Sequence, residues 1–203
     1  IVCSEKILPS HFGNPESYQR FSEDTNTYNC VSIFLLAFAV LGEDFSLACQ
    51  IGYQLKPHAD QLSVGLFFTE YHFFHTIALF EQLPHMAFME RMKAFRTIRQ
   101  NRRTIDRLSR DCPSIFEPKK LLLKAMAAAY KKDPKASSLF CAAILQAQLH
   151  ELPQVEALAH EMLAKLYATH HQWPSTELHY GEAKLKYAEW GFLPKLLSID
   201  KKI

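Results

Sequence analysis

Two histidines three positions apart are the first residues in this sequence that could carry chemistry. His72 and His75 would occupy neighbouring positions on one face of a helix. A metal site needs further ligands at fixed spacing, and no such motif accompanies the pair. Six aromatic residues surround the two histidines: Phe67, Phe68, Tyr71, Phe73, Phe74 and Phe80. We therefore expect both to be hydrogen-bonded packing residues of a buried aromatic helix, and we predict no metal or cofactor.

Two further histidines and one cysteine are the other residues that could take part in chemistry. His170 and His171 come at the end of a predicted helix, where they are expected to cap exposed carbonyls, with proton sensing as the alternative. Cys112 follows Arg110 and Asp111, but no histidine nearby completes a nucleophile and base pair. The five cysteines contain no C-x-x-C pair, which favours free, mostly buried thiols in a reducing, cytoplasmic setting. We predict that this segment is not an enzyme.

The most biased stretch is basic. Between Arg91 and Arg110 the chain has eight basic residues and one acid, Asp106, against 15 basic and 20 acidic residues elsewhere. At about 100° per residue, five arginines fall within a sector of about 80°. These candidate interaction residues are Arg96, Arg99, Arg103, Arg107 and Arg110. The opposite side is apolar, so the sequence predicts an amphipathic helix whose basic face is either solvated or a docking surface for an acidic neighbour.

A nucleic-acid partner for this helix is the less favoured alternative. Basic or aromatic residues elsewhere would be needed to follow a phosphate backbone, and the remainder of the chain is acidic overall. Nucleic-acid binding would weaken steeply with salt and with charge reversal at Arg99 and Arg103.

Composition limits the remaining function classes. The 203 residues are 48% hydrophobic, and they include 10 Pro but only 6 Gly. No glycine lies between Leu66 and Tyr180, which excludes a Gly-rich phosphate loop or a dinucleotide fingerprint there. The longest uncharged apolar stretch, Val31 to Leu41, is too short to span a membrane. Because the chain opens at Ile1 with no signal-peptide pattern, we expect it to be a segment of a longer cytoplasmic protein.

Prolines mark where the helices that carry these residues should start. They recur at intervals of 19 to 29 residues from Pro57 to Pro194, and proline is tolerated in the first turn of a helix but not in its interior. After an irregular start through Phe21, the predicted helices are 24–41, 43–55, 60–83, 85–110, 117–132, 135–151, 154–171 and 175–190, with a short tail helix near Pro194. No period-two alternation indicates a sheet.

The last four predicted helices have the lengths and short connections of stacked helix hairpins. Large, small and aromatic residues match the positions of the tetratricopeptide repeat at Leu163, Ala164, Tyr167, Tyr180 and Ala183. The preceding pair matches more weakly through Ala136, Phe140 and Ala143, with a 40-residue offset instead of about 34. The pattern is typical of a degenerate repeat of that class.

Four ordered motifs resemble a known family of very large signalling multi-kinases. They are the run from Thr69 to Leu79, Asp111-Cys112-Pro113 with Phe116, the run from Glu156 to Glu161, and Tyr187-Ala188-Glu189-Trp190-Gly191. In that family a kinase-like domain and an AAA-type (STAND-like) ATPase precede a tetratricopeptide-like helical region, a GAF sensor and a histidine kinase. The resemblance covers about residues 60 to 200 and concerns the helical region. This chain departs from it at His160, where Asn is usual, and at Phe192, where Ala is usual.

Together these observations predict an all-α fold, an irregular helix-hairpin solenoid with degenerate tetratricopeptide-like repeats. Residues 1–83 would form a helical subdomain around the aromatic helix, and residues 84–203 would hold the basic helix and the hairpins. The resemblance implies a non-catalytic scaffold that couples an ATPase or kinase to a sensor output domain. The alternative is a free-standing adaptor for a protein or peptide partner.

Overall fold

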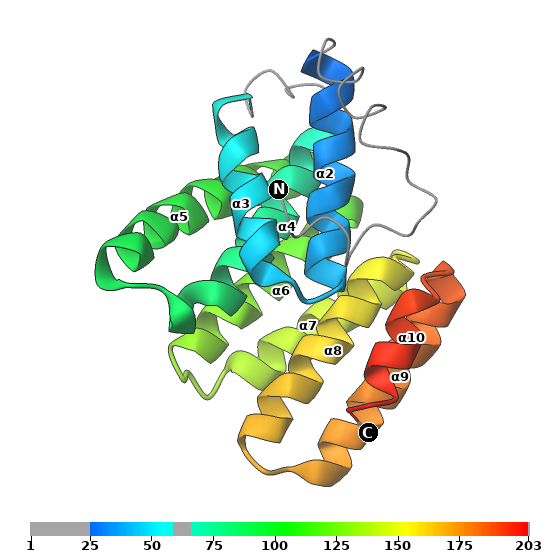
Figure 1. The fold of residues 1–203 in the computed structure, drawn as a ribbon. Helices are drawn as coiled ribbons and strands as arrows, with labels where there is room; N and C mark the ends of the chain where they lie inside the picture. Colours follow the sequence, from blue (N-terminus) through cyan, green and yellow to red (C-terminus); the bar gives the residue numbers. More distant parts are fainter. Residues whose placement is uncertain (1–24, 59–65, 203) are drawn as a thin grey trace. The chain divides into compact units, whose positions relative to one another are not determined.

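The computed structural model describes residues 25–58 and 66–202, and every regular element within these ranges is a helix (Figure 1). The expected all-α class is therefore confirmed for the described part of the chain. The chain divides into two compact units, residues 1–101 (unit 1) and residues 102–203 (unit 2). The division falls inside one long helix, α5 (Phe88–Asp111).

In the described part of unit 1, three helices and two 3-10 turns precede α5. Their bounds are α2 (Thr25–Leu41), α3 (Phe45–Leu55), η2 (Lys56–His58), α4 (Leu66–Gln82) and η3 (Leu83–His85). Because η3 takes up Leu83–His85 and Met86 is extended, α5 begins at Phe88, three residues later than predicted. The predicted irregular start through Phe21 and the first residues of the predicted 60–83 helix lie outside the described residues.

The centre of unit 1 is the aromatic helix α4, where every residue from Tyr71 to Phe80 is buried. Helix α3 approaches it closely at Gly52, where an added Cβ would overlap the imidazole ring of His75. Only a residue without a side chain fits that position, so Gly52 is required by a close approach of two helices. The expectation that the aromatic helix is buried on most sides is confirmed.

Unit 2 contains the end of α5 and five further helices. They are α6 (Pro113–Tyr130), α7 (Ala136–Leu149), α8 (Pro153–Thr169), α9 (Trp173–Trp190) and α10 (Pro194–Ile199). Proline is the first residue of α6, α8 and α10 and the second of α9, as the proline spacing predicted. Helix α6 starts four residues before the predicted Glu117, because Pro113 opens its first turn, and the helix then accommodates Pro118 in its interior.

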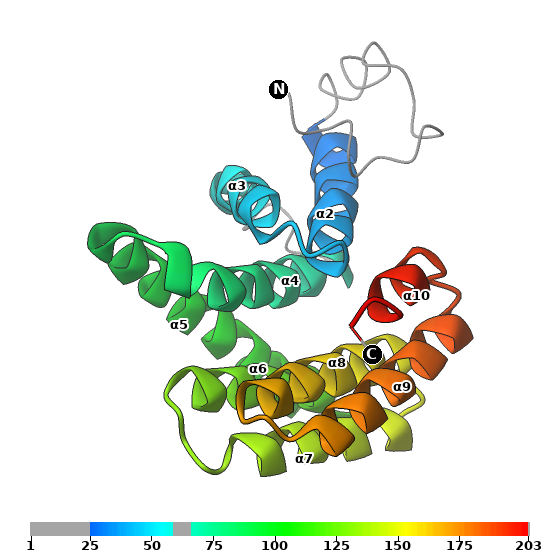
Figure 2. The same ribbon diagram turned by 60° about the horizontal axis from the view of Figure 1, so that its bottom comes forward.

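Helix α8 is the centre of unit 2. It packs against α6, α7 and α9 (Figure 2), and every residue from Val155 to Ala164 is buried. Alanines with no exposed surface, among them Ala143, Ala164 and Ala183, lie in these contacts and let the helices approach one another.

Five of the turns between described helices share one backbone geometry. Each contains a residue with positive φ: Glu43, Lys132, Glu151, His171 and Gly191. The amide of the following residue donates to the carbonyl five positions back, as from Leu152 to Ala147 and from Gln172 to Tyr167. This is the Schellman arrangement, in which glycine is the usual left-handed residue. Four of these five turns use a residue with a side chain, so the chain forms them with very little glycine.

The described cysteines only partly match the expectation. Cys30, Cys49, Cys112 and Cys141 are free, and Cys3 lies outside the described residues. Only Cys49 is buried, and its burial raises the pKa of the thiol to about 12. The expectation that the thiols are mostly buried is wrong for this part of the chain, because Cys30 and Cys112 are half-buried and Cys141 is exposed.

Candidate functional site

The five predicted interaction arginines all lie on the exposed side of α5. Ala94, Ile98 and Ile105 are buried on the opposite side, so the predicted amphipathic character of this helix is confirmed. Arg96 and Arg99 belong to unit 1, whereas Arg103, Arg107 and Arg110 belong to unit 2. Among the described residues, no acidic side chain forms an ion pair with any of the five. Their role in an interaction stays a prediction.

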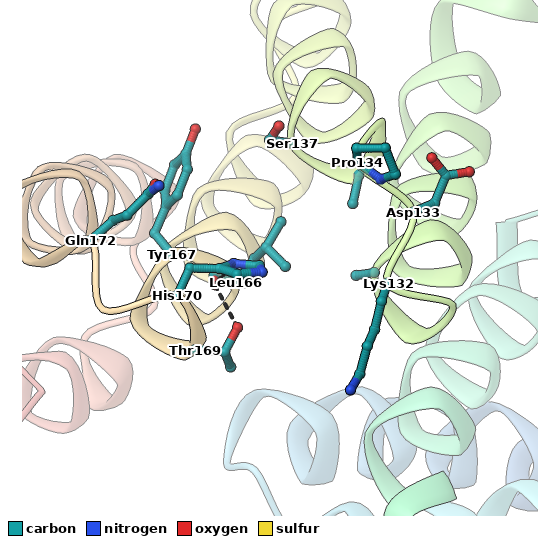
Figure 3. Close-up of a pocket in the computed structure, with 11 residues that line it drawn as sticks. Lys132, Asp133, Pro134, Ser137, Leu166, Tyr167, Thr169, His170 and Gln172 are labelled. Carbon is teal, nitrogen blue, oxygen red and sulfur yellow. Dashed lines mark hydrogen bonds between the residues drawn. The ribbon is translucent and has the colours of Figure 1, made fainter.

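Unit 2 has a pocket where the turns of two successive hairpins meet (Figure 3). Its volume is about 660 Å³. The α6–α7 turn contributes Lys132, Asp133 and Pro134, and α7 adds Ser137. Across the pocket lie the last turn of α8 and the turn to α9, with Tyr167, Thr169, His170 and Gln172. The pocket therefore combines residues that lie far apart in the sequence.

Two side chains at the end of α8 cap the same carbonyl. The ring Nδ1 of His170 lies 2.9 Å from the carbonyl oxygen of Leu166, and the Thr169 hydroxyl donates to that oxygen at 2.7 Å (Figure 3). The prediction that His170 caps this helix is confirmed. His171 instead occupies the left-handed position of the turn, and its ring contacts Trp173.

The pocket lining holds one lysine and one carboxylate, Lys132 and Asp133. The Asp133 carboxylate accepts from the amide of Lys135 at 2.9 Å, so it is engaged at the start of α7. Of the three lysines near it in the sequence, Lys132 lines the pocket, whereas Lys131 and Lys135 are exposed outside the lining. The Tyr167 hydroxyl, whose pKa is raised by burial and then by Cys141, adds a neutral donor. Such a lining suits a polar segment of a partner.

Deeper in unit 2, two histidines join α8 to α9. The Nδ1 atoms of His160 and His179 are 2.9 Å apart, so one ring donates to the other. The His179 ring also stacks on Tyr167, with a centroid distance of 5.5 Å. Burial, followed by the nearby His179 and Lys186, lowers the pKa of His160 to about 4. Burial also lowers the pKa of His179. Both rings are therefore neutral near pH 7, and the pair works as a hydrogen-bonded contact between helices.

A buried ionic cluster lies on α8 beside this pair. Glu161 is 1% exposed, and its carboxylate lies 2.9 Å from Lys195 Nζ and 3.1 Å from Lys202 Nζ. It also accepts from the Tyr187 hydroxyl at 2.8 Å. One turn earlier, Glu156 accepts from Gln148 at 2.8 Å and pairs with Lys186 at 3.3 Å. These contacts connect α8 to α7, α9, α10 and the residues after α10.

The two histidines of α4 are packing residues, as the sequence predicted. His72 Nδ1 lies 2.9 Å from the side-chain oxygen of Asn101, and His75 Nδ1 lies 3.3 Å from the Tyr71 hydroxyl. Burial, followed by Lys56 and His72, lowers the pKa of His75 to about 3. Within residues 25–58 and 66–202, no group of three or more histidine, cysteine, aspartate or glutamate side chains is placed to hold a metal ion.

Sequence reasoning did not find the pocket, because its residues belong to two turns and neither turn has a recognised motif. A usable signal was present, since Lys131, Lys132 and Lys135 cluster in one turn and His170 and His171 in the other. The hairpin prediction brings such turns to one end of a helical stack.

The comparisons with known proteins identify no relative. No model of a protein family, no curated protein and no solved structure matches this chain. None of the described helices is long and apolar enough to cross a bilayer. The likeness to signalling multi-kinases therefore rests on the four sequence motifs alone. In the structure, Glu156, His160, Glu161 and Tyr187 from those motifs are buried and engaged in polar contacts between helices.

Proposed function

We propose that this chain is a non-catalytic helical scaffold that couples an ATPase or kinase to a sensor output domain. The proposal combines the resemblance to the helical region of signalling multi-kinases with the hairpins of unit 2. In this proposal α6–α9 form a short, degenerate tetratricopeptide-like solenoid. Its partner is a protein, either a neighbouring domain of the same chain or a separate molecule in the cytoplasm.

The observation that carries the proposal is the pocket between the two turns. A segment bound there would contact the α6–α7 turn and the α8–α9 turn together. Occupancy would then favour one arrangement of the two hairpins over others. A ligand shifts such an equilibrium only through contacts that differ between the arrangements, and a pocket shared by two hairpins supplies such contacts.

Substitution of Lys132 in the full-length protein tests this role. Lys132 lines the pocket, whereas the adjacent Lys131 is exposed outside it, so Lys131→Glu is the matched control for Lys132→Glu. We expect Lys132→Glu to change the regulated ATPase or kinase output by roughly tenfold, which corresponds to a typical coupling free energy between two sites. Deletion of the segment should have the same or a larger effect. Unchanged regulation after the deletion, or equal effects of the two lysine variants, would contradict the proposal.

A free-standing adaptor is the second candidate, and exposed leucines favour it. Leu145 and Leu149 on α7 and Leu178 and Leu185 on α9 are each at least 60% exposed and lie opposite the buried side of their helices. Exposed apolar residues grouped on one helix face mark interaction surfaces. An adaptor would bind its partner as an isolated chain and would lose that binding in Leu178→Ser/Leu185→Ser. A coupling module would instead show its effect only within the longer protein.

A further inference from the structure

One surface of unit 1 combines large exposed apolar side chains with cations. It is formed by the first three turns of α5, where Phe88 is 72% exposed, Met89 is 67% exposed and Met92 is 49% exposed. The next exposed residues along this face are Lys93, Arg96 and Arg99. We call these six residues the α5 patch.

The α5 patch occupies one side of the helix. At about 100° per residue, its members fall within about 140°, and Phe88, Met92, Arg96 and Arg99 fall within about 80°. The buried residues Ala94, Thr97, Ile98 and Asn101 lie opposite. The patch is therefore the outward face of a helix whose other face enters the core of unit 1.

No acidic residue belongs to this face. Glu90 is the one acid of α5 within unit 1, it lies to the side of the patch, and its carboxylate accepts from the amide of Ala87 at 3.2 Å. Arg91 points elsewhere, since its guanidinium donates to the carbonyl of Met86 at 3.1 Å. The patch thus carries three cations and no opposing charge.

The apolar and cationic side chains of the α5 patch favour one kind of partner over others. The methionines, lysine and arginines of the patch have long adaptable side chains. Among the described residues, no carboxylate holds Lys93, Arg96 or Arg99 in a fixed geometry. An anionic bilayer surface needs no fixed geometry, because its charge is dense and mobile and an apolar layer lies just below the headgroups.

We propose that the α5 patch binds the surface of a lipid bilayer that contains anionic headgroups. Phe88, Met89 and Met92 enter the boundary between headgroups and acyl chains. Lys93, Arg96 and Arg99 remain at headgroup level and contact the anionic lipids. This is peripheral binding and is separate from the pocket of unit 2, so it does not depend on the proposed scaffold function.

Flotation of the chain with vesicles tests the proposal. The probes are vesicles of phosphatidylcholine alone and of phosphatidylcholine with about 30% phosphatidylserine, at about 0.1 M salt. We expect at least tenfold stronger binding to the anionic vesicles. Phe88→Ser/Met89→Ser/Met92→Ser and Arg96→Glu/Arg99→Glu should each reduce that binding at least tenfold. All five substituted side chains are exposed, so circular dichroism should show an unchanged helix content.

Two matched controls use exposed residues of unit 2. Leu145→Ser/Leu149→Ser removes exposed apolar area from α7, and Lys131→Glu/Lys135→Glu reverses two exposed cations. Both should leave vesicle binding within about twofold of the unaltered chain, well below the expected loss of at least tenfold.

Three outcomes would overturn the proposal. One is equal binding to neutral and anionic vesicles. Another is an equal loss in a control and in the corresponding patch variant. The third is binding that depends on Arg96 and Arg99 but not on Phe88, Met89 and Met92, together with tighter binding to a DNA duplex, which would identify a nucleic-acid surface.

Discussion

Unit 1 buries imidazole and amide side chains among aromatic rings, whereas unit 2 buries, besides the imidazole of His160, carboxylates that contact ammonium and hydroxyl groups. In unit 1, both side-chain polar atoms of Asn29 and Nε2 of His75 have no hydrogen-bond partner among the described residues. In unit 2, Glu161 has three polar partners within 3.1 Å. The core of unit 1 is therefore specified mainly by shape, and the core of unit 2 is specified in addition by directional ionic contacts.

Neutralising Glu161 should produce the largest effect. Glu161→Gln leaves the buried ammonium of Lys195 beside an uncharged amide, so we expect the free energy of unfolding to fall by about 3–5 kcal/mol. Chemical denaturation monitored by circular dichroism measures this change. Glu177→Gln, an exposed site on α9, should change stability by less than about 0.5 kcal/mol. A small effect of Glu161→Gln on the free energy of unfolding would mean that the core of unit 2, like that of unit 1, is specified mainly by shape.

Adding one methyl group at Gly52 should produce the next largest effect, in unit 1. Gly52→Ala forces the buried His75 ring to move, and we expect a loss of about 1–3 kcal/mol. Gly181→Ala is the matched control, because nothing lies within 4 Å of its Cβ position on α9. That control should stabilise the chain by about 0.5–1 kcal/mol, because alanine favours the helix. If Gly52→Ala is tolerated in a chain that also carries His75→Ala, shape complementarity at this contact is established.

Lowering the pH should weaken both units through their buried histidines. The pKa of His75 is lowered to about 3 and that of His160 to about 4 from the ordinary 6.5, so the unfolded chain takes up these protons first. Their stabilising contribution is complete above pH 6.5 and is lost as the pH falls towards the folded values.

For His160 we expect a loss of about 2 kcal/mol between pH 7 and pH 4. Thermal unfolding at several pH values measures it. The variant His160→Gln should remove the part of the pH dependence that arises from His160. A pH profile that is the same in His160→Gln and in the unaltered chain would show that this pair is not responsible.

Glycine at a left-handed turn position should produce the smallest change, and it should be stabilising. Glu151 has φ 54° in the α7–α8 turn and is exposed, so Glu151→Gly should raise stability by about 0.5–1 kcal/mol. Glu43 has φ 62° in unit 1 but makes further contacts that glycine would lose. A smaller gain is therefore expected for Glu43→Gly, and differential scanning calorimetry would compare the two. An equal or larger gain at Glu43 would contradict this ranking.

The helices were predictable because their signals are local. Proline at the start of α6, α8 and α10 and the aromatic run of α4 each specify an element within a few residues. The exposure of the five α5 arginines on one face was predictable from the angular spacing of residues along a helix alone. The resemblance and the proposed signalling role, in contrast, gain no support from the comparisons.

The sites that the sequence did not predict depend on contacts between distant residues. The Tyr187 hydroxyl meets Glu161 across 26 residues, and the pocket joins the turn at Lys132 with the turn at His170. The exposure of Cys141 was not predicted, because most of the helix around it is apolar. The sequence of such a helix does not show which of its faces packs against neighbouring helices. Such positions are decided by packing, which one sequence does not display.

Lys132 shows a consequence of using a residue with a side chain at the left-handed position of a turn. Its φ of 56° makes it a less stable choice than glycine, yet its side chain lines the pocket. Replacing the residue at this position would change the side chain that lines the pocket while the backbone of the turn stayed the same. Among residues that carry a side chain, the loss of stability relative to glycine stays small and roughly constant. Glycine at this position would raise stability but would leave no side chain to line the pocket.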